Sequence, residues 1–359
     1  MKPIGILLAL LLMPVFWNPA PAYAVDKDKG QDSETLRQYA DRLGFIIGSK
    51  IRPKSWDEDK QGRDILAREF NATTVMGMMN TVERQPGRFN FNMMDRTIDF
   101  AKDHHMKVWG SALIYRQDSL PDWMHERPMR AWNPKELDDI MKKHIQTVVR
   151  HGGDIFYGWG VVNEPNNRNE PWESAFGKEE YISKAFRYAR EATSVPLVLN
   201  ETFGHAGAER GKTDDFFKLV KHLKSQGVPI DGVGTEMHLE ADQLKPNYLD
   251  EFRYWLDQAR DAGTTVYITE MDVYQGPSSS TGAFETQKKI YHDVTAACLA
   301  DSNCKAINIW DLEDRDTWLA TKKRDAHPDA KPVLFGDGYE KKPAYYGVLE
   351  ALKEAAAKK

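Results

Sequence analysis

The sequence has only two cysteines among 359 residues, and it has no excess of basic residues. Its 49 Lys and Arg stand against 54 Asp and Glu, a formal net charge of −5, so nucleic acids and anionic membranes are disfavoured as partners. It also lacks the glycine-rich phosphate loops of nucleotide-binding folds. Because the serine elbow and the His-Glu-x-x-His motif are absent too, nothing in the sequence supports serine-hydrolase or zinc-peptidase chemistry.

Long apolar runs are missing except at the N-terminus, where residues 4–15 are almost entirely apolar. Lys2 precedes this run, and Ala22-Tyr23-Ala24 matches the small-x-small pattern of a cleavage site. A membrane anchor needs about 20 apolar residues, whereas Pro14 interrupts this run. We therefore predict a cleaved signal peptide over residues 1–24 and a secreted or periplasmic mature protein without a membrane span.

The two cysteines, Cys298 and Cys304, are six residues apart. In an exported chain this spacing favours a local disulfide. A metal site would require further ligands nearby, and the sequence shows none there. We therefore expect a Cys298–Cys304 disulfide, no metal and no cofactor, in a protein that we expect to be monomeric.

The composition indicates a folded core with a surplus of aromatic side chains. Hydrophobic residues make up 41% and charged residues 29% of the chain, as in globular proteins and unlike disordered ones. The 10 Trp and 14 Tyr exceed what a core normally needs. Because the C–H faces of sugars stack on aromatic rings, such a surplus suits a carbohydrate-binding cleft.

Eight short β-branched or apolar runs alternate with amphipathic helical segments along the chain. This alternation predicts parallel βαβ units, and eight of them match an α/β fold, the (β/α)₈ barrel, as a single domain. An open doubly wound sheet is the alternative, but its nucleotide-binding loop is missing. Residues 25–40 are expected to be a polar lead into the first helix, and residues 41–359 to be the barrel. Strands are expected within 44–51, 70–76, 107–115, 155–164, 196–203, 231–239, 265–273 and 306–312, and helices within 93–105, 134–151, 178–192, 214–226, 248–262 and 285–300.

Two of the expected strands carry a glutamate near the C-terminal end, where barrel enzymes place reactive groups. Glu164 ends the fourth strand, and Glu270 lies near the end of the seventh. A single glutamate in such a place is more often a surface acid. A pair facing each other across the barrel mouth suits glycosidic hydrolysis, in which one carboxyl protonates the leaving oxygen and the other attacks or positions water.

The segments around these glutamates are distinctive. They are Val-Val-Asn-Glu (161–164) and Ile-Thr-Glu-Met-Asp (268–272), together with Leu-Pro-Asp-Trp (120–123), Pro-Gly-Arg-Phe-Asn-Phe (86–91), Asp-Gly-Val-Gly-x-x-x-His (231–238) and Lys-Pro-Ala-Tyr-Tyr (342–346). In this order the chain resembles glycoside hydrolase family 10 over nearly all of its mature length. The resemblance implies a retaining endo-β-1,4-xylanase on a (β/α)₈ barrel.

The resemblance also implies roles for individual residues. Glu164 would be the acid/base, Glu270 the nucleophile, and Asn163 would bond the 2-hydroxyl of the sugar at the cleaved bond. The supporting residues that it implies are His238 and Asp272, which would orient and polarise Glu270, and Trp310 and Trp318, which would form an aromatic floor and lid around that sugar.

Several strand ends depart from the family pattern. Where the family usually has Glu-Asn-x-Met-Lys-Trp, this chain has Met-Gly-Met-Met-Asn-Thr (76–81). Where the family usually has Gly-His-Thr-Leu-Val-Trp-His, this chain has Gly-Ser-Ala-Leu-Ile-Tyr-Arg (110–116), and Glu236 stands in place of a glutamine. These departures predict retained glycosidase chemistry with altered substrate choice. The candidate substrate contacts at these positions are Asn80, Tyr115, Arg116 and Glu236.

Two of these residues are open to more than one interpretation. Arg116 either pairs with a uronate or phosphate substituent of the substrate or only neutralises Glu236. A third carboxylate at Glu236 beside Glu270 is expected to couple the two titrations and to raise one apparent pKa.

Three functions are consistent with the sequence. The first is a secreted retaining endo-β-1,4-glycanase, most simply a xylanase that acts by double displacement. The second is a family relative that acts on a different, acidic or decorated polysaccharide such as an exopolysaccharide. The third is a non-catalytic carbohydrate-binding barrel, which would have no need of Glu164 and Glu270. In each case the partner is a polysaccharide or an oligosaccharide.

Overall fold

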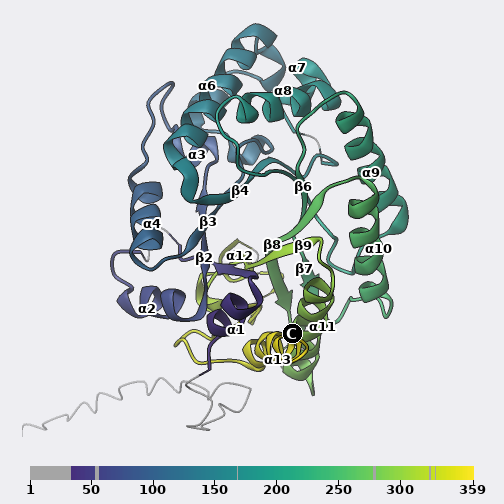
Figure 1. Ribbon diagram of the computed structural model, residues 1–359. Coiled ribbons are helices and arrows are strands. Elements are labelled where there is room, and N and C mark those ends of the chain that lie inside the picture. The colour runs from purple at the N-terminus through teal and green to yellow at the C-terminus, as the bar shows by residue number, and fades with distance from the viewer. Residues whose placement is uncertain (1–33, 53–55, 168, 278–279, 323–324, 328) are drawn as a thin grey trace, which may run out of the picture.

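Parallel strands close into a barrel, and helices cover its outside (Figure 1). This computed structural model describes residues 34–52, 56–167, 169–277, 280–322, 325–327 and 329–359, so the predicted signal peptide (1–24) lies outside the described residues. The barrel closes because its first strand pairs with both its second and its last strand. The predicted single-domain (β/α)₈ barrel is confirmed. Its eight strands are β1 (Ile46–Ser49), β2 (Ala72–Met76), β3 (Lys107–Ser111), β4 (Phe156–Asn163), β5 (Leu197–Glu201), β6 (Gly232–Thr235), β8 (Thr265–Tyr274) and β9 (Cys304–Ile309).

The sixth predicted strand differs from its expected form. Instead of running unbroken to residue 239, it ends with β6 at Thr235, and a separate short strand β7 (His238–Glu240) pairs with β8. Met237 between the two has a left-handed φ of +57°, which a strand cannot contain. The apolar character of Met237 fits a buried strand, so the sequence pattern did not reveal this break.

Each outer helix covers the barrel with an apolar stripe. In α6 (Pro134–Gly152), Leu137, Met141 and Ile145 recur every four residues and are fully buried, while the Asn133 side chain caps the helix start. The other helices of more than five residues are α1 (Leu36–Leu43), α2 (Lys60–Glu69), α4 (Asn92–Asp103), α8 (Lys178–Arg190), α9 (Arg210–Ser225), α10 (Tyr248–Asp261), α11 (Ala283–Ala300) and α13 (Pro343–Ala357), and the shorter ones are α3 (Met79–Val82), α5 (Asp122–His125), α7 (Trp172–Phe176) and α12 (Trp318–Lys322).

Aromatic rings fill the barrel near the start of its strands. Trp109 of β3 lies with its ring centroid 5.4 Å from that of Tyr157 and 5.4 Å from that of Tyr267. Gly158 makes room for this packing, because a Cβ atom there would stand 2.6 Å from the Trp109 ring. These rings therefore belong to the core and close this end of the barrel.

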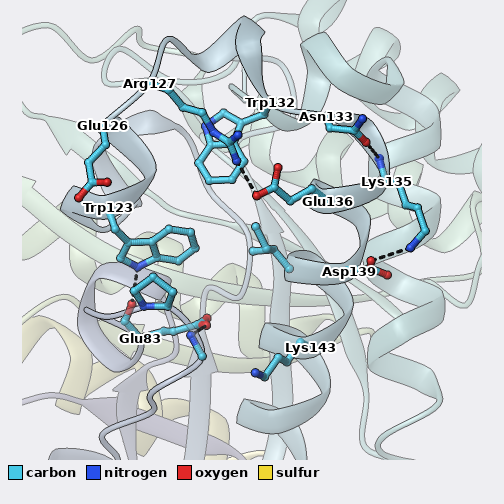
Figure 2. Close-up of a pocket in the computed structure, with 13 residues that line it drawn as sticks. Glu83, Trp123, Glu126, Arg127, Trp132, Asn133, Lys135, Glu136, Asp139 and Lys143 are labelled. Carbon is cyan, nitrogen blue, oxygen red and sulfur yellow. Dashed lines mark hydrogen bonds and ion pairs between the residues drawn. The ribbon is translucent and has the colours of Figure 1, made fainter.

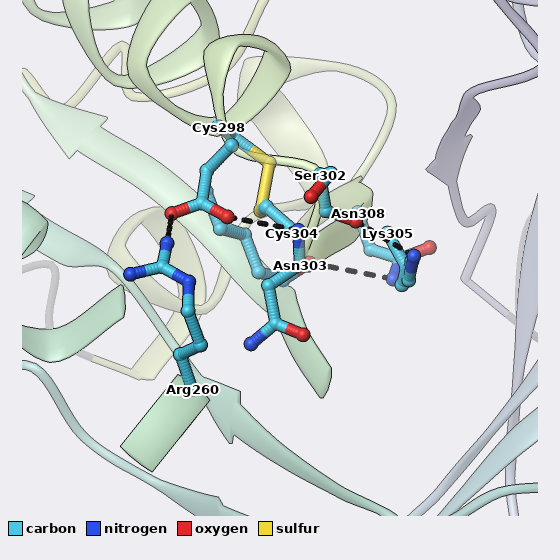
Figure 3. The surroundings of a disulfide bond; sticks show 9 residues. Arg260, Cys298, Ser302, Asn303, Cys304, Lys305 and Asn308 are labelled. Atoms are coloured by element: carbon cyan, nitrogen blue, oxygen red, sulfur yellow. Dashed lines mark hydrogen bonds and ion pairs between the residues drawn. A yellow bond between two sulfur atoms is a disulfide. The ribbon is translucent and has the colours of Figure 1, made fainter. Parts of the chain in front are cut away.

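The disulfide predicted between Cys298 and Cys304 is confirmed (Figure 3). It joins the end of α11 to the first residue of β9, across the turn between them. Arg260 of α10 pairs with Asp301 in this turn, and the Asn303 side-chain amide donates to the Thr264 carbonyl oxygen at 2.7 Å. The disulfide thus belongs to a cross-linked junction between helix and strand, at the end of the barrel opposite the strand termini that carry the glutamates.

A buried ion pair anchors the last helix to the barrel. Lys342 precedes α13 and is fully buried, and its ammonium donates to Asp314 at 2.9 Å and to the carbonyl oxygens of Lys331 and Val333, both at 2.6 Å. Burial raises the pKa of Asp314 to about 6 and lowers the pKa of Lys342, although each partner opposes the shift of the other.

Among the described residues, no helix has the length and hydrophobicity to cross a membrane.

Replacing the buried lysine tests this anchor. We expect Lys342→Met to lower the free energy of unfolding by about 3 to 5 kcal/mol, because Asp314 would remain buried without its cation. The double variant Lys342→Met/Asp314→Asn removes both charges and should lose clearly less. Urea unfolding of the three proteins measures both effects. Equal losses in the single and the double variant would show that the charge of Asp314 is not the cause.

Candidate active site

The C-terminal ends of β4 to β8 bring together most of the residues that the sequence singled out. Asn163 ends β4 and Glu164 follows it, Glu236 follows β6, and Glu270 lies in β8. Glu270 is 7% and Glu236 3% exposed, so both carboxyl groups are held largely away from solvent. Glu164 has a left-handed φ of +47°, a conformation that few non-glycine residues adopt.

A chain of polar contacts runs from Asp272 to Glu270. Asp272 Oδ1 lies 2.9 Å from His238 Nδ1, and His238 Nε2 lies 3.5 Å from Glu270 Oε2. Burial of His238 disfavours its charged form, but the nearby Asp272, Glu270 and Glu236 outweigh this and raise the pKa of His238 well above its usual value. The imidazole between the two carboxylates therefore favours its cationic form.

Trp318 covers the outer side of this chain. Its indole N–H donates to Asp272 Oδ2 at 2.7 Å, and its ring meets the edge of the His238 ring at a centroid distance of 5.2 Å. The sequence predicted a lid at Trp318, and the structure places this half-buried side chain against Asp272 and His238.

Amide side chains connect the two sides of the mouth. Asn200 of β5 donates from Nδ2 toward Glu270 Oε1 at 3.2 Å and toward Asn163 Oδ1 at 2.6 Å. Asn163 in turn donates to Glu236 Oε1 at 3.2 Å. Burial, together with the negative charges of Glu270 and Glu164, raises the pKa of Glu236 well above its usual value. Glu236 therefore holds a proton more readily than an exposed glutamate.

Glu164 has its own set of donors. The Tyr115 hydroxyl donates to Oε1 at 2.6 Å, Arg116 Nη1 lies 3.4 Å from Oε2, and the Asn167 amide also donates to Oε2. Burial and the charge of Glu164 raise the pKa of the Tyr115 hydroxyl. These contacts fix the position of the Glu164 carboxyl group at the mouth.

The structure shows the direct partners of Arg116 and places two residues, Asn80 and Trp310, outside the contact network. The Arg116 guanidinium contacts Glu164 and, at 3.3 Å, Asp118, whereas Glu236 acts on it only through its charge at longer range. Arg116 lies in the loop after β3, and the sequence does not encode which carboxylate a loop residue contacts. Asn80 donates to the Asp118 carbonyl oxygen at 3.2 Å, so its amide is directed away from the two glutamates. Trp310 lies beneath the Lys50 ammonium, 4.4 Å from the ring centroid.

Sequence reasoning missed several residues at the site. Asn200 is the clearest, since its side chain contacts Glu270, Asn163 and Glu236, and Thr269 Oγ1 donates to its Oδ1 at 2.7 Å. The sequence did place Asn200 near the end of an expected strand, and this position could have indicated that it belongs to the site. The next residue, Glu201, is buried, and burial raises its pKa to about 7. In the described part of the chain, no group of His, Cys, Asp and Glu is arranged to hold a metal ion.

Comparison with known proteins agrees with this geometry. The chain is 28% identical over 335 residues to endo-1,4-beta-xylanase B of Thermotoga neapolitana, an alignment that covers 90% of this chain and 93% of that protein. It is 30% identical over 328 residues to exoglucanase XynX of Acetivibrio thermocellus, which covers 86% of this chain but 29% of that longer protein. The fold matches native xylanase 10B from Thermotoga maritima with a TM-score of 0.81, at 30% identity, over 91% of this chain and 100% of that one.

A family assignment follows from one further match. Residues 35–351, a span that contains both glutamates and every residue of the contact network, match the sequence profile described as Glycosyl hydrolase family 10. The chain is therefore a glycoside hydrolase and belongs to glycosyl hydrolase family 10.

Proposed function

We propose that this protein is a secreted enzyme that cleaves internal β-1,4 bonds of xylan and retains the anomeric configuration. The observation that carries the proposal is the Asp272–His238–Glu270 chain, which is joined through Asn200 to the strand end that bears Glu164. Two named relatives that align over almost their whole length, 93% and 100%, are xylanases. The N-terminal signal pattern and the disulfide support export.

In the first proposed step, Glu270 acts as the nucleophile. A carboxylate oxygen of Glu270 bonds to the anomeric carbon while the bond from that carbon to the leaving oxygen breaks. The leaving oxygen takes a proton from Glu164. The products are a released sugar chain and a glycosyl ester on Glu270, and Glu164 is left ionised among Tyr115, Arg116 and Asn167.

In the second step, water replaces the ester. The Glu164 carboxylate takes a proton from a water molecule whose oxygen bonds to the anomeric carbon, and the bond to Glu270 breaks. His238 stabilises the carboxylate that is released, because its cation lies 3.5 Å from Glu270 Oε2. Two inversions at one carbon give net retention.

The remaining residues are assigned to substrate and proton control. Asn163 is positioned to bond the 2-hydroxyl, and Trp310 and Trp318 to stack on or cover the sugar ring. Glu236 is assigned to hold a proton, so that only one negative charge stands beside Asn200 during the first step. With Glu236 ionised as well, two carboxylates would face the same buried amide.

One observation favours a second candidate substrate, a β-glycan other than plain xylan. At the C-terminal end of β2, Gly77 and Met79 are buried, and the Asn80 amide is engaged by the Asp118 carbonyl oxygen. This strand end therefore offers few free hydrogen-bond donors to an unsubstituted xylose. A glycan whose substituents are bound at another part of the barrel mouth would not depend on hydrogen-bond donors at this strand end.

The acid role of Glu164 predicts an effect that depends on the leaving group. We expect Glu164→Ala to lose about 10² to 10⁴-fold in kcat/KM on xylo-oligosaccharides, but much less on a dinitrophenyl β-xylobioside, whose leaving oxygen needs no proton. Glu270→Ala should lose activity on both substrates. Proton NMR of the wild-type reaction should show the β-anomer first. An α-anomer as the first product would refute retention, and equal losses of Glu164→Ala on both substrates would refute its acid role.

The second candidate substrate predicts a ranking in a polysaccharide panel. If recognition has shifted away from plain xylan, kcat/KM on a substituted xylan or acidic exopolysaccharide should exceed that on linear xylan, because the strand ends that hold an unsubstituted xylose are altered. Product analysis on linear xylan, substituted xylan, β-glucan and an acidic exopolysaccharide measures the ranking. Highest activity on linear xylan would leave the simple xylanase as the function.

The raised pKa of Glu236 predicts how stability changes with pH. When the pKa of a carboxyl group is higher in the folded than in the unfolded chain, the fold loses stability as pH rises above the unfolded pKa. The reason is that the unfolded chain releases this proton more easily than the folded one. Glu236→Gln should therefore gain stability over the wild type by at least about 1 kcal/mol between about pH 5 and about pH 8. Denaturation at the two pH values measures this gain, with the exposed-site variant Glu58→Gln as control. If the difference between Glu236→Gln and wild type is the same at both pH values, the assignment fails.

A further inference from the structure

A cavity of about 620 Å³ opens beside the C-terminal ends of β1 and β2, outside the cluster of catalytic glutamates. Four cationic side chains line it, Lys50, Arg52, Arg84 and Arg88, and none of its described lining residues carries a carboxylate. This charge stands out in a chain whose net charge is −5. We call this space the cationic cavity.

A tight turn holds two of the four cations at the rim. In the turn Gln85-Pro86-Gly87-Arg88, the Arg88 N–H donates to the Gln85 carbonyl oxygen at 3.0 Å, and Gly87 has a φ of +68°. Proline followed by a glycine of positive φ forms a type II turn with a fixed backbone. The turn therefore places Arg88 and the preceding Arg84 in the lining of the same cavity.

The rim arginines have only neutral partners among the described residues. Arg84 Nε donates to the Asn80 carbonyl oxygen at 3.2 Å, and Arg88 Nη1 donates to the Gln85 side chain at 3.1 Å. Neither forms an ion pair with a described carboxylate, so most of their N–H groups are available to a ligand. A guanidinium presents these groups in a plane that matches a carboxylate.

The floor of the cavity also keeps a positive charge. Lys50 and Arg52, with side chains 12% and 26% exposed, share the single buried carboxylate of Asp311. Four cations less one carboxylate leave three positive charges around the cavity when Asp311 is ionised. Because the floor is partly shielded from water, its charge is screened less than that of a surface lysine.

A second, larger cavity has acidic as well as basic side chains in its lining (Figure 2). Its volume is about 1060 Å³, and it lies between α5 and α6. There the charges pair internally, since Arg127 contacts Glu136 at 2.6 Å and Lys135 contacts Asp139 at 2.9 Å.

In the part of the chain that the structure describes, no carboxylate lines the cationic cavity, and only Lys50 and Arg52 of its cations pair with an acid, Asp311. The charges of Arg84 and Arg88 are therefore left for a ligand from outside the chain.

The cationic cavity adjoins the proposed sugar platform. Register between β1 and β9 pairs Gly48 with Asn308, and two residues further along the Lys50 ammonium lies over the Trp310 ring. The backbone N–H of Trp310 donates to the carbonyl oxygen of Met271, the residue after Glu270. A glycan whose sugar rests on Trp310 therefore passes the edge of the cavity, within reach of its cations.

We propose that the cationic cavity is a subsite for a carboxylate substituent of the glycan, such as a uronic acid branch, and that Arg84 and Arg88 bind this carboxylate at the rim above Lys50 and Arg52. The inference rests on the proposed glycan hydrolysis, and it names the substrate class as an acidic glycan. It moves the acid-recognising role from Arg116, which contacts Glu164, to the turn at residues 85–88.

Charge removal at the rim tests the subsite. The experiment compares kcat/KM on glucuronoxylan with kcat/KM on the same polymer after its carboxyl groups are reduced to alcohols. We expect the wild type to favour the acidic polymer and Arg84→Gln/Arg88→Gln to lower this preference about tenfold. The matched control is Arg150→Gln/Arg253→Gln, which removes two charges from exposed helix positions outside the cationic cavity and should keep the preference.

The outcomes separate the subsite from the chemistry. Turnover of an aryl β-xyloside, which has no carboxylate, should be equal in the three proteins, and this reports on folding and on the two glutamates. An unchanged preference in Arg84→Gln/Arg88→Gln, or no preference in the wild type, would overturn the subsite while leaving the hydrolysis in place. If no substrate is cleaved, the proposed function fails, and calorimetric titration with a glucuronic acid-substituted xylo-oligosaccharide decides the subsite alone. Binding that is lost in the rim variant but kept in the control supports it, and equal binding refutes it.

Discussion

The mouth of the barrel depends on one buried cation among several carboxylates. Glu270, Glu236 and Asp272 are each less than a tenth exposed, and His238 is the cationic side chain in contact with all three. Several buried carboxylates cannot all be ionised without compensation. The single positive charge of His238 lies between Asp272 and Glu270, and Glu236 can hold a proton. The amides of Asn163 and Asn200, which would be incidental elsewhere, are required here to satisfy the remaining oxygens.

The sequence predicted the parts of this arrangement that are encoded locally. Glu164 and Glu270 each lie in an apolar strand end with distinctive neighbours, and the alternation of strands and helices was strong enough to indicate a closed barrel. The disulfide was predictable too, since its cysteines are six residues apart and leave no other pairing. In these cases the information lies within a few residues or in a repeating pattern.

Features that arise only when distant strands meet were not predictable. Asn200 contacts Glu270 across seventy residues of sequence, and an asparagine at a strand end has many ordinary uses. The partner of Arg116 depends on the side-chain direction, which residue types do not specify. Lys342 reads as a surface residue, yet it is fully buried on Asp314 and two carbonyl oxygens. The break at Met237 was hidden because an apolar residue there also fits a continuous strand.

The core rings of Trp109, Tyr157 and Tyr267, near the start of the strands, determine how a polymer can reach the enzyme. Because these rings close one end of the barrel, a polymer cannot thread through it and must arrive and depart over a single open rim. Any branch on the polymer can then project only sideways, over the loops that follow the strands. Selectivity for branches is therefore a property of individual rim loops, and one loop can be altered without disturbing the sealed interior that supports it.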